Sequence, residues 1–89
     1  ADICFLGVGG ISKNGISTYA LPETAVNRVI LERTTGHRII VTEGFKVGRD
    51  SNFHTADCNM ITHLITDHTA DPKTVAYLKS IGVKVLFIS

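Results

Sequence analysis

The chain has 89 residues, of which 44% are hydrophobic and 19% charged, and its formal net charge is +1 at pH 7. This length suffices for one small domain, and the composition is that of a globular protein and not of a disordered segment. The near-neutral charge argues against a surface built for nucleic acid or anionic lipid, and the apolar runs are too short to cross a membrane.

The first half of the chain predicts a strand, a glycine-rich loop and a helix. The apolar run at residues 3–6 is typical of a strand buried on both faces of a parallel sheet. Pro22 suits the first position of a helix and Glu23 its first turn, while Gly36 is a suitable C-terminal stop. The apolar face of this helix is expected to comprise Ala25, Val26, Val29 and Ile30.

The second half predicts three more strands and a second helix. Asp71 and Pro72 form an N-cap followed by a first-position proline, and Gly82 ends the helix. Residues 51–59 show no clear periodicity, and we expect a turn there with Phe53 tucked in. The expected strands are residues 38–41, 62–66 and 83–88.

This order of elements predicts an α/β fold with a mainly parallel sheet of about four strands and flanking helices. Right-handed crossovers place the loops after Leu6, Val41 and Thr66 at one edge of such a sheet. Because open α/β sheets bind ligands outside the carboxyl ends of their strands, this edge is the expected ligand site.

Glycines, a carboxylate and an ammonium group reach this edge from different elements. Glycine lets the backbone approach a ligand closely, a carboxylate accepts sugar hydroxyls, and an ammonium meets a phosphate or hydroxyl as a point charge. A simpler interpretation remains open, in which Glu23 stabilises the helix dipole and Lys46 is a solvated loop residue. The candidate site residues are Gly7, Gly9, Gly10, Gly15, Glu23 and Lys46.

Other chemistries find little support in the residue pattern. Ser12 stands where a GxGxxG dinucleotide motif needs its last glycine, and the histidines at 37, 54, 63 and 68 lack zinc-ligand spacing. Cys4 and Cys58 lie far apart, which predicts two reduced thiols in a cytoplasmic protein. No signal-peptide pattern is present, and we expect no metal, no cofactor and no membrane partner.

Four stretches resemble, in order and spacing, the later part of the sensor domain of the DeoR family of bacterial transcription repressors. Residues 23–28 are similar to the family's E-x-A-V-K-R, and residues 46–49 to the end of its D-S-S-K-F-G-R. The resemblance covers nearly the whole chain. The other two stretches are residues 1–7 with Gly10, Ile11, Gly15 and Thr18, and Ile65-Thr66-Asp67 followed by a helix and a strand.

The resemblance implies a fold shared with ribose-5-phosphate isomerase and the coenzyme A transferases. It also implies binding of a phosphorylated sugar or related metabolite that relieves repression. Glu23 falls where the isomerase has its catalytic base, and Lys46 where it has a substrate-contacting lysine. On this basis residues 1–89 form the C-terminal part of the sensor domain. Operator DNA would be bound by a winged helix-turn-helix that is absent from this chain.

The chain departs from the family pattern at several positions. Gly9 and Ser12 replace residues that are often acidic, and residues 43–45 are Glu-Gly-Phe in place of Asp-Ser-Ser. Isomerase chemistry needs positioned carboxylates for proton transfer, so these changes argue against an enzyme and leave the ligand's identity open.

Two other functions remain possible from the sequence. One is a fragment of a sugar-phosphate isomerase-fold enzyme, supported by Glu23, Glu43 and Lys46. The other is an α/β domain used only for oligomerisation. We also expect this chain to form a homo-oligomer, because strands that are apolar on both faces leave costly surface uncovered.

Overall fold

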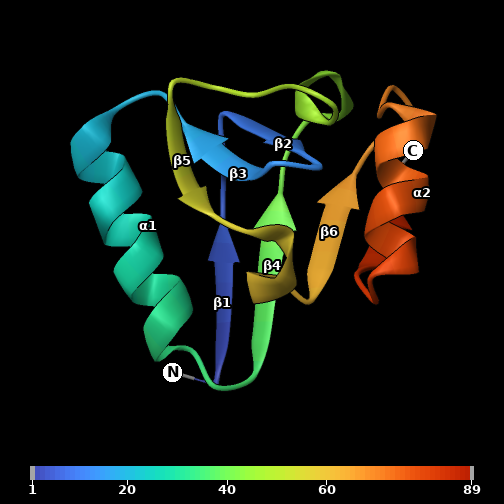
Figure 1. Ribbon diagram of the computed structural model, residues 1–89. Coiled ribbons are helices and arrows are strands. Elements are labelled where there is room, and N and C mark those ends of the chain that lie inside the picture. The colour runs from blue at the N-terminus through green and yellow to red at the C-terminus, as the bar shows by residue number, and fades with distance from the viewer. Residues whose placement is uncertain (1, 89) are drawn as a thin grey trace.

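The computed structural model describes residues 2–88, which fold into two sheets and two helices (Figure 1). The larger sheet is parallel and comprises, in spatial order, β1 (Ile3–Leu6), β4 (His37–Val41), β6 (His63–Thr66) and β7 (Lys84–Phe87). The smaller sheet is antiparallel and comprises β2 (Gly10–Ser12), β3 (Gly15–Thr18) and β5 (Phe53–Ala56). The helices are α1 (Leu21–Arg33) and α2 (Pro72–Ser80), with short 3-10 turns η1 (Gly44–Lys46) and η2 (Cys58–Met60).

The predicted α/β fold with a parallel four-stranded sheet is confirmed. Each of its strands lies within one residue of its expected bounds. The start of α2 is also confirmed, because the Asp71 carboxylate caps the helix by accepting the Thr74 amide at 3.1 Å. Gly82 follows the helix with φ +95°, a conformation that favours glycine.

The smaller sheet was not predicted. Residues expected to form one continuous loop pair instead as the hairpin β2–β3, whose turn passes through Gly15 at φ +116°. Strand β5 pairs with β3 across more than thirty residues of sequence, where a turn was expected. Phe53 is 37% exposed and is not tucked in. Such short strands, rich in Gly, Ser and Thr, lack the apolar runs that reveal a strand.

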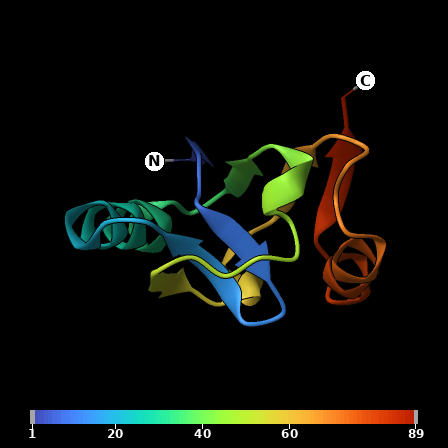
Figure 2. The ribbon, with the colours of Figure 1, turned by 90° about the horizontal axis from the view of Figure 1, so that it is seen from above.

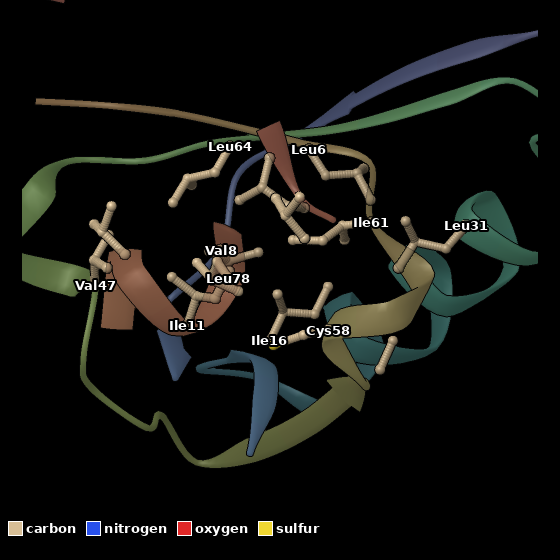
Figure 3. Close-up of a cluster of buried hydrophobic side chains, with 14 of the residues drawn as sticks. Leu6, Val8, Ile11, Ile16, Leu31, Val47, Cys58, Ile61, Leu64 and Leu78 are labelled. Carbon is tan, nitrogen blue, oxygen red and sulfur yellow. The ribbon is translucent and has the colours of Figure 1, made fainter. Parts of the chain in front are cut away.

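The hydrophobic core lies between the two sheets and beneath the helices (Figure 3). Leu6, Ile40 and Leu64 contribute from the larger sheet, and Ile11 and Ile16 from the hairpin. The remaining core residues include Val8, Leu31, Val47, Cys58, Ile61 and Leu78. The hairpin therefore forms one wall of the core, which is why all its residues except those of the turn are buried.

The other face of the larger sheet is bare. The smaller sheet and α2 lie on one side of it (Figure 2), and on the opposite side Ile3, Phe5, Val41 and Leu86 are 42–60% exposed. The register places these residues on one face, because side chains alternate along each strand. The expectation that residues 3–6 are buried on both faces is therefore wrong, although Ile39 of β4, which shares this face, is buried. We call this surface the bare face.

Most of the expected apolar stripe of α1 also faces outward, whereas Ile30 is partly buried against the core. Val26 is 58% exposed and Val29 48%, whereas the buried residues of the helix are Thr24, Asn27 and Leu31. Arg28 is exposed, and its Nε donates to the Thr55 carbonyl at 2.9 Å. This bond and the packing of the helix on β3 and β5 set its rotation. The helix ends at Arg33, with Thr34 as its C-cap residue. Gly36, which was expected to stop the helix, is instead packed against the Asp2 carbonyl.

None of the helices among residues 2–88 is both long enough and apolar enough to cross a membrane. The two cysteines, Cys4 and Cys58, are buried free thiols. Burial raises the pKa of the Cys58 thiol, with the Asp57 carboxylate adding to the shift.

We predict that the 89-residue chain self-associates through the bare face. Exposed apolar surface costs about 25 cal/mol per Å², so pairing two bare faces relieves it. The double variant Phe5→Ser, Leu86→Ser should shift sedimentation equilibrium at micromolar concentration toward monomer. Val26→Ser is the matched control, because it removes an exposed apolar side chain of α1. A wild-type chain that is monomeric and melts cooperatively would contradict the prediction.

We also predict that stability falls as the pH is lowered through the histidine range. His63 lies on the bare face, its ring 5.0 Å from that of His37. Burial, followed by His37 and Lys84, lowers the pKa of His63 below its usual value. The unfolded chain, with an ordinary pKa of about 6.5, therefore takes up the proton first, and stability present above that pH is lost as the pH falls toward the folded pKa.

Thermal melts across this pH range test the effect. The decrease in melting temperature should be smaller in His63→Gln than in the control His68→Gln, whose ring stacks on Phe87 away from the pair. Equal decreases in the two variants would show that His63 is not responsible.

Candidate functional site

A cavity of about 420 Å³ opens at the carboxyl end of the larger sheet. The carboxyl ends of β1 and β4 and the first turn of α1 lie at the same end of the molecule (Figure 1). This volume is in the range of small-molecule sites. The cavity, which we call the edge cavity, is lined by Gly7, Val8, Gly9, Tyr19, Glu23, Asn27, Val41, Glu43 and Lys46.

The helix α1 contributes two polar side chains to the edge cavity. Glu23 is in its first turn and Asn27 lies four residues on, so both project from the same face of the helix. Asn27 is only 8% exposed, and its side-chain amide has no hydrogen-bond partner among residues 2–88. One helix thus presents a carboxylate that accepts hydrogen bonds beside an amide that can donate and accept them.

Two buried threonines fix the start of this helix. The hydroxyls of Thr18, at the end of β3, and Thr24 are hydrogen-bonded to each other. Thr24 Oγ1 also donates to the Ala20 carbonyl at 3.1 Å, which ties the first turn to the N-cap residue Ala20. The hydrogen bond between Thr24 and Thr18 of the hairpin therefore fixes the position of the adjacent Glu23.

The opposite wall carries Lys46 and Glu43. Lys46 Nζ lies 3.5 Å from Glu43 Oε1, and the lysine side chain is 19% exposed against 59% for the glutamate. The ammonium also lies 5.8 Å from the centre of the Tyr19 ring, within the range of a cation–π contact. The aromatic face of Tyr19 thus forms part of the lining next to the cation.

The structure brings together four of the six sequence-predicted site residues. Gly7, Gly9, Glu23 and Lys46 line the edge cavity, whereas Gly10 and Gly15 do not. Gly10 is buried in β2, where a Cβ would meet the Arg49 carbonyl, and Gly15 begins β3 directly after the hairpin turn, with a positive φ. These two glycines shape the smaller sheet, so their backbone requirements are those of the hairpin.

Five lining residues were absent from the predicted site: the apolar Val8 and Val41, and Tyr19, Asn27 and Glu43. Asn27 could have been found, because it follows Glu23 by one helical turn. Glu43 was noted only as support for an enzyme, and Tyr19 had no signal because its place depends on the hairpin. The formal charge of the lining is −1, from Glu23 and Glu43 against Lys46. The edge cavity therefore favours hydroxyl and carbonyl groups, which carboxylates and amides bind, over a bare anion.

A second polar cluster lies outside the edge cavity. Ser12 Oγ donates to one oxygen of the Asp50 carboxylate, and Asn14 Nδ2 donates to the other at 3.0 Å. These bonds lower the pKa of Asp50 and tie the hairpin to the loop before β5. Ser12 is thus engaged away from the edge cavity.

The DeoR C-terminal sensor domain family matches residues 1–68 of the chain. The chain belongs to this family. A search of curated proteins finds no match. The DeoR sensor domain is a regulatory module of transcription factors, so this chain has the effector-binding role of a DeoR-family regulator. The family match includes β1, β4, β6 and every residue that lines the edge cavity.

Proposed function

We propose that this chain is the effector-sensing part of a DeoR-family repressor of sugar metabolism, and that the edge cavity binds the hydroxyl-bearing part of a phosphorylated sugar. The observation that carries the proposal is that Glu23 and Lys46, from a helix and a distant turn, line one cavity. Glu23 and Asn27 suit vicinal hydroxyls, Tyr19 offers a ring for the apolar face of a sugar, and Lys46 suits a carbonyl or phosphate oxygen.

The charge of the lining limits which part of the ligand it holds. Two carboxylates and one ammonium disfavour a dianionic phosphate at the centre of the edge cavity. The phosphate would then lie toward Lys46 or beyond the cavity, against residues outside this chain. In the full-length regulator, effector binding would weaken the hold of a winged helix-turn-helix on operator DNA, in an oligomeric cytoplasmic protein.

The enzyme alternative is less well supported. Proton transfer in an isomerase needs several positioned carboxylates, but position 9 is glycine and Ser12 is engaged with Asp50 outside the edge cavity. Lys46 is moreover paired with Glu43. We therefore assign Glu23 and Lys46 to binding and propose no catalytic role for them.

A thermal-shift screen of the full-length regulator tests the proposal, because a bound effector raises apparent stability by mass action. The screen compares phosphorylated pentoses and hexoses with the corresponding free sugars and with inorganic phosphate. We expect a phosphorylated sugar to stabilise most and inorganic phosphate least. The proposal would be contradicted if no sugar in the screen stabilised the regulator. It would also be contradicted if inorganic phosphate alone stabilised the regulator as much as the phosphorylated sugars do.

We predict that Glu23→Gln weakens binding of the sugar phosphate identified in that screen. Loss of a hydrogen bond to a charged group of about 1.5–3 kcal/mol corresponds to roughly 10- to 150-fold in affinity. Melting should barely change, since a helix-terminal Glu is worth about 0.3–1 kcal/mol through the dipole. Glu32→Gln, on the same helix but outside the edge cavity, is the control. A large fall in melting temperature with normal affinity would show a structural role.

We further predict that Lys46→Met weakens binding of the sugar phosphate more than binding of the corresponding free sugar. Lys46 is the single cation of the described lining, so its loss acts on the anionic part of the ligand. Isothermal titration of both compounds measures the difference, and Lys13→Met, in the exposed turn of the hairpin, is the control. Equal weakening for the two compounds would place the phosphate away from Lys46.

A further inference from the structure

Asp67 holds together two loops at the carboxyl edge of the larger sheet. It follows β6, and its Oδ2 accepts the Gly44 amide at 3.0 Å. Its Oδ1 accepts the amide and the hydroxyl of Thr69, at 2.8 and 2.5 Å. One carboxylate thus connects the start of η1 to a segment 23 residues away. These bonds from Thr69 and Gly44 lower the pKa of Asp67, so the bonded form is the anion.

Gly44 fits this contact because it has no side chain. A Cβ there would overlap Thr69 Oγ1 and Asp67 Oδ1 and would lie 2.5 Å from the Ala70 amide nitrogen. Glycine at 44 and aspartate at 67 together fix where η1 begins.

The turn η1 connects Gly44, which Asp67 holds, to Lys46 in the lining of the edge cavity. Within it the Lys46 amide donates to the Glu43 carbonyl at 3.1 Å, and the Val47 amide to the Gly44 carbonyl at 3.0 Å. The exit is held where the Gly48 amide donates to the Ile11 carbonyl at 2.7 Å. Glu43 and Lys46 therefore sit on a single turn anchored at both ends, and their side chains pair across it.

Asp67 itself does not line the edge cavity. It borders a neighbouring hollow of about 210 Å³ that shares Val41 and Glu43 with the edge cavity. The hydrogen bond from the Gly44 amide is the contact that links Asp67 to η1, and η1 carries Lys46 of the lining.

We propose that Asp67 is a positioning residue, which holds Gly44 and thereby places the Lys46 ammonium and the Glu43 carboxylate in the edge cavity. The placement is a property of the unliganded chain. Its consequence, weaker sugar-phosphate binding when Asp67 is changed, rests on the proposed function.

The test measures the placement without any ligand. The full-length regulator is briefly acetylated with an N-hydroxysuccinimide ester, and each lysine's labelling rate is read by mass spectrometry. In the wild type, Lys46 should react more slowly than the exposed Lys13. In Asp67→Asn and in Gly44→Ala its rate should rise about fivefold, the population change expected from losing one net hydrogen bond.

Asp50→Asn is the matched control. Its carboxylate also joins distant segments by hydrogen bonds, to Ser12 and Asn14, but outside the edge cavity. It should lose comparable stability and leave Lys46 labelling unchanged. Thr69→Val removes only one donor to Asp67 and serves as a milder variant if the others fail to fold; it should label at an intermediate rate.

Unchanged Lys46 labelling in folded Asp67→Asn, or the same rise in Asp50→Asn, would overturn the positioning role. Titration with the sugar phosphate that most stabilises the wild type separates the two proposals. Faster labelling in a regulator that no sugar phosphate stabilises would support the positioning role and refute the proposed function. If the wild type binds a sugar phosphate but Lys46 labelling is unchanged in Asp67→Asn, the proposed function is supported and the positioning role is refuted.

Discussion

Strands β1, β4 and β6 run parallel, with Leu6 opposite Ile40 and Ile40 opposite Leu64. The rest of the molecule depends on this ladder, because parallel strands bring their carboxyl ends to one edge and their connections must cross over the sheet. The loop after β1 becomes the hairpin, and the loop after β4 becomes η1. The segment after β1 and the turn η1 both lie near the start of α1. The edge cavity is the space between these three elements.

The same ladder explains why the core is one-sided. The hairpin and α2 both cover the face that carries Leu6, Ile40 and Leu64, leaving the opposite face bare within residues 2–88. Two sheets packed on a single core can be stable with one face exposed, but an exposed apolar face calls for a partner surface. The edge cavity and the bare face meet at Val41, which lines the cavity and is one of the exposed residues of the face.

Polar contacts, more than apolar ones, set the geometry of the edge cavity. The Thr18–Thr24 pair fixes the first turn of α1, and Asp67 fixes the first residue of η1 through Gly44. Hydrogen bonds are directional, so they hold a turn in one orientation where apolar packing alone would allow it to slide. This is consistent with a lining whose polar side chains come from turns and from the helix α1 and not from strands.

The sequence by itself determined the elements whose signals are local. The apolar runs located β1, β4, β6 and β7, Asp71 located the start of α2, and the order of elements predicted the parallel sheet whose carboxyl edge joins Glu23 to Lys46. Motif spacing also identified the family. Each of these signals lies within a few residues, where propensity and capping act.

Only the tertiary structure decided the smaller sheet, the rotation of α1 and the place of Tyr19 in the lining. Strand β3 finds its partner β5 far along the chain, and no local pattern specifies such a pairing. The rotation of α1 follows from the bonds of Arg28 to β5 and of Thr24 to β3, which outweigh the apolar stripe. Burial of an apolar stripe stabilises a helix only where a surface lies against it, and within residues 2–88 the face of α1 that is buried carries Thr24, Asn27 and Leu31.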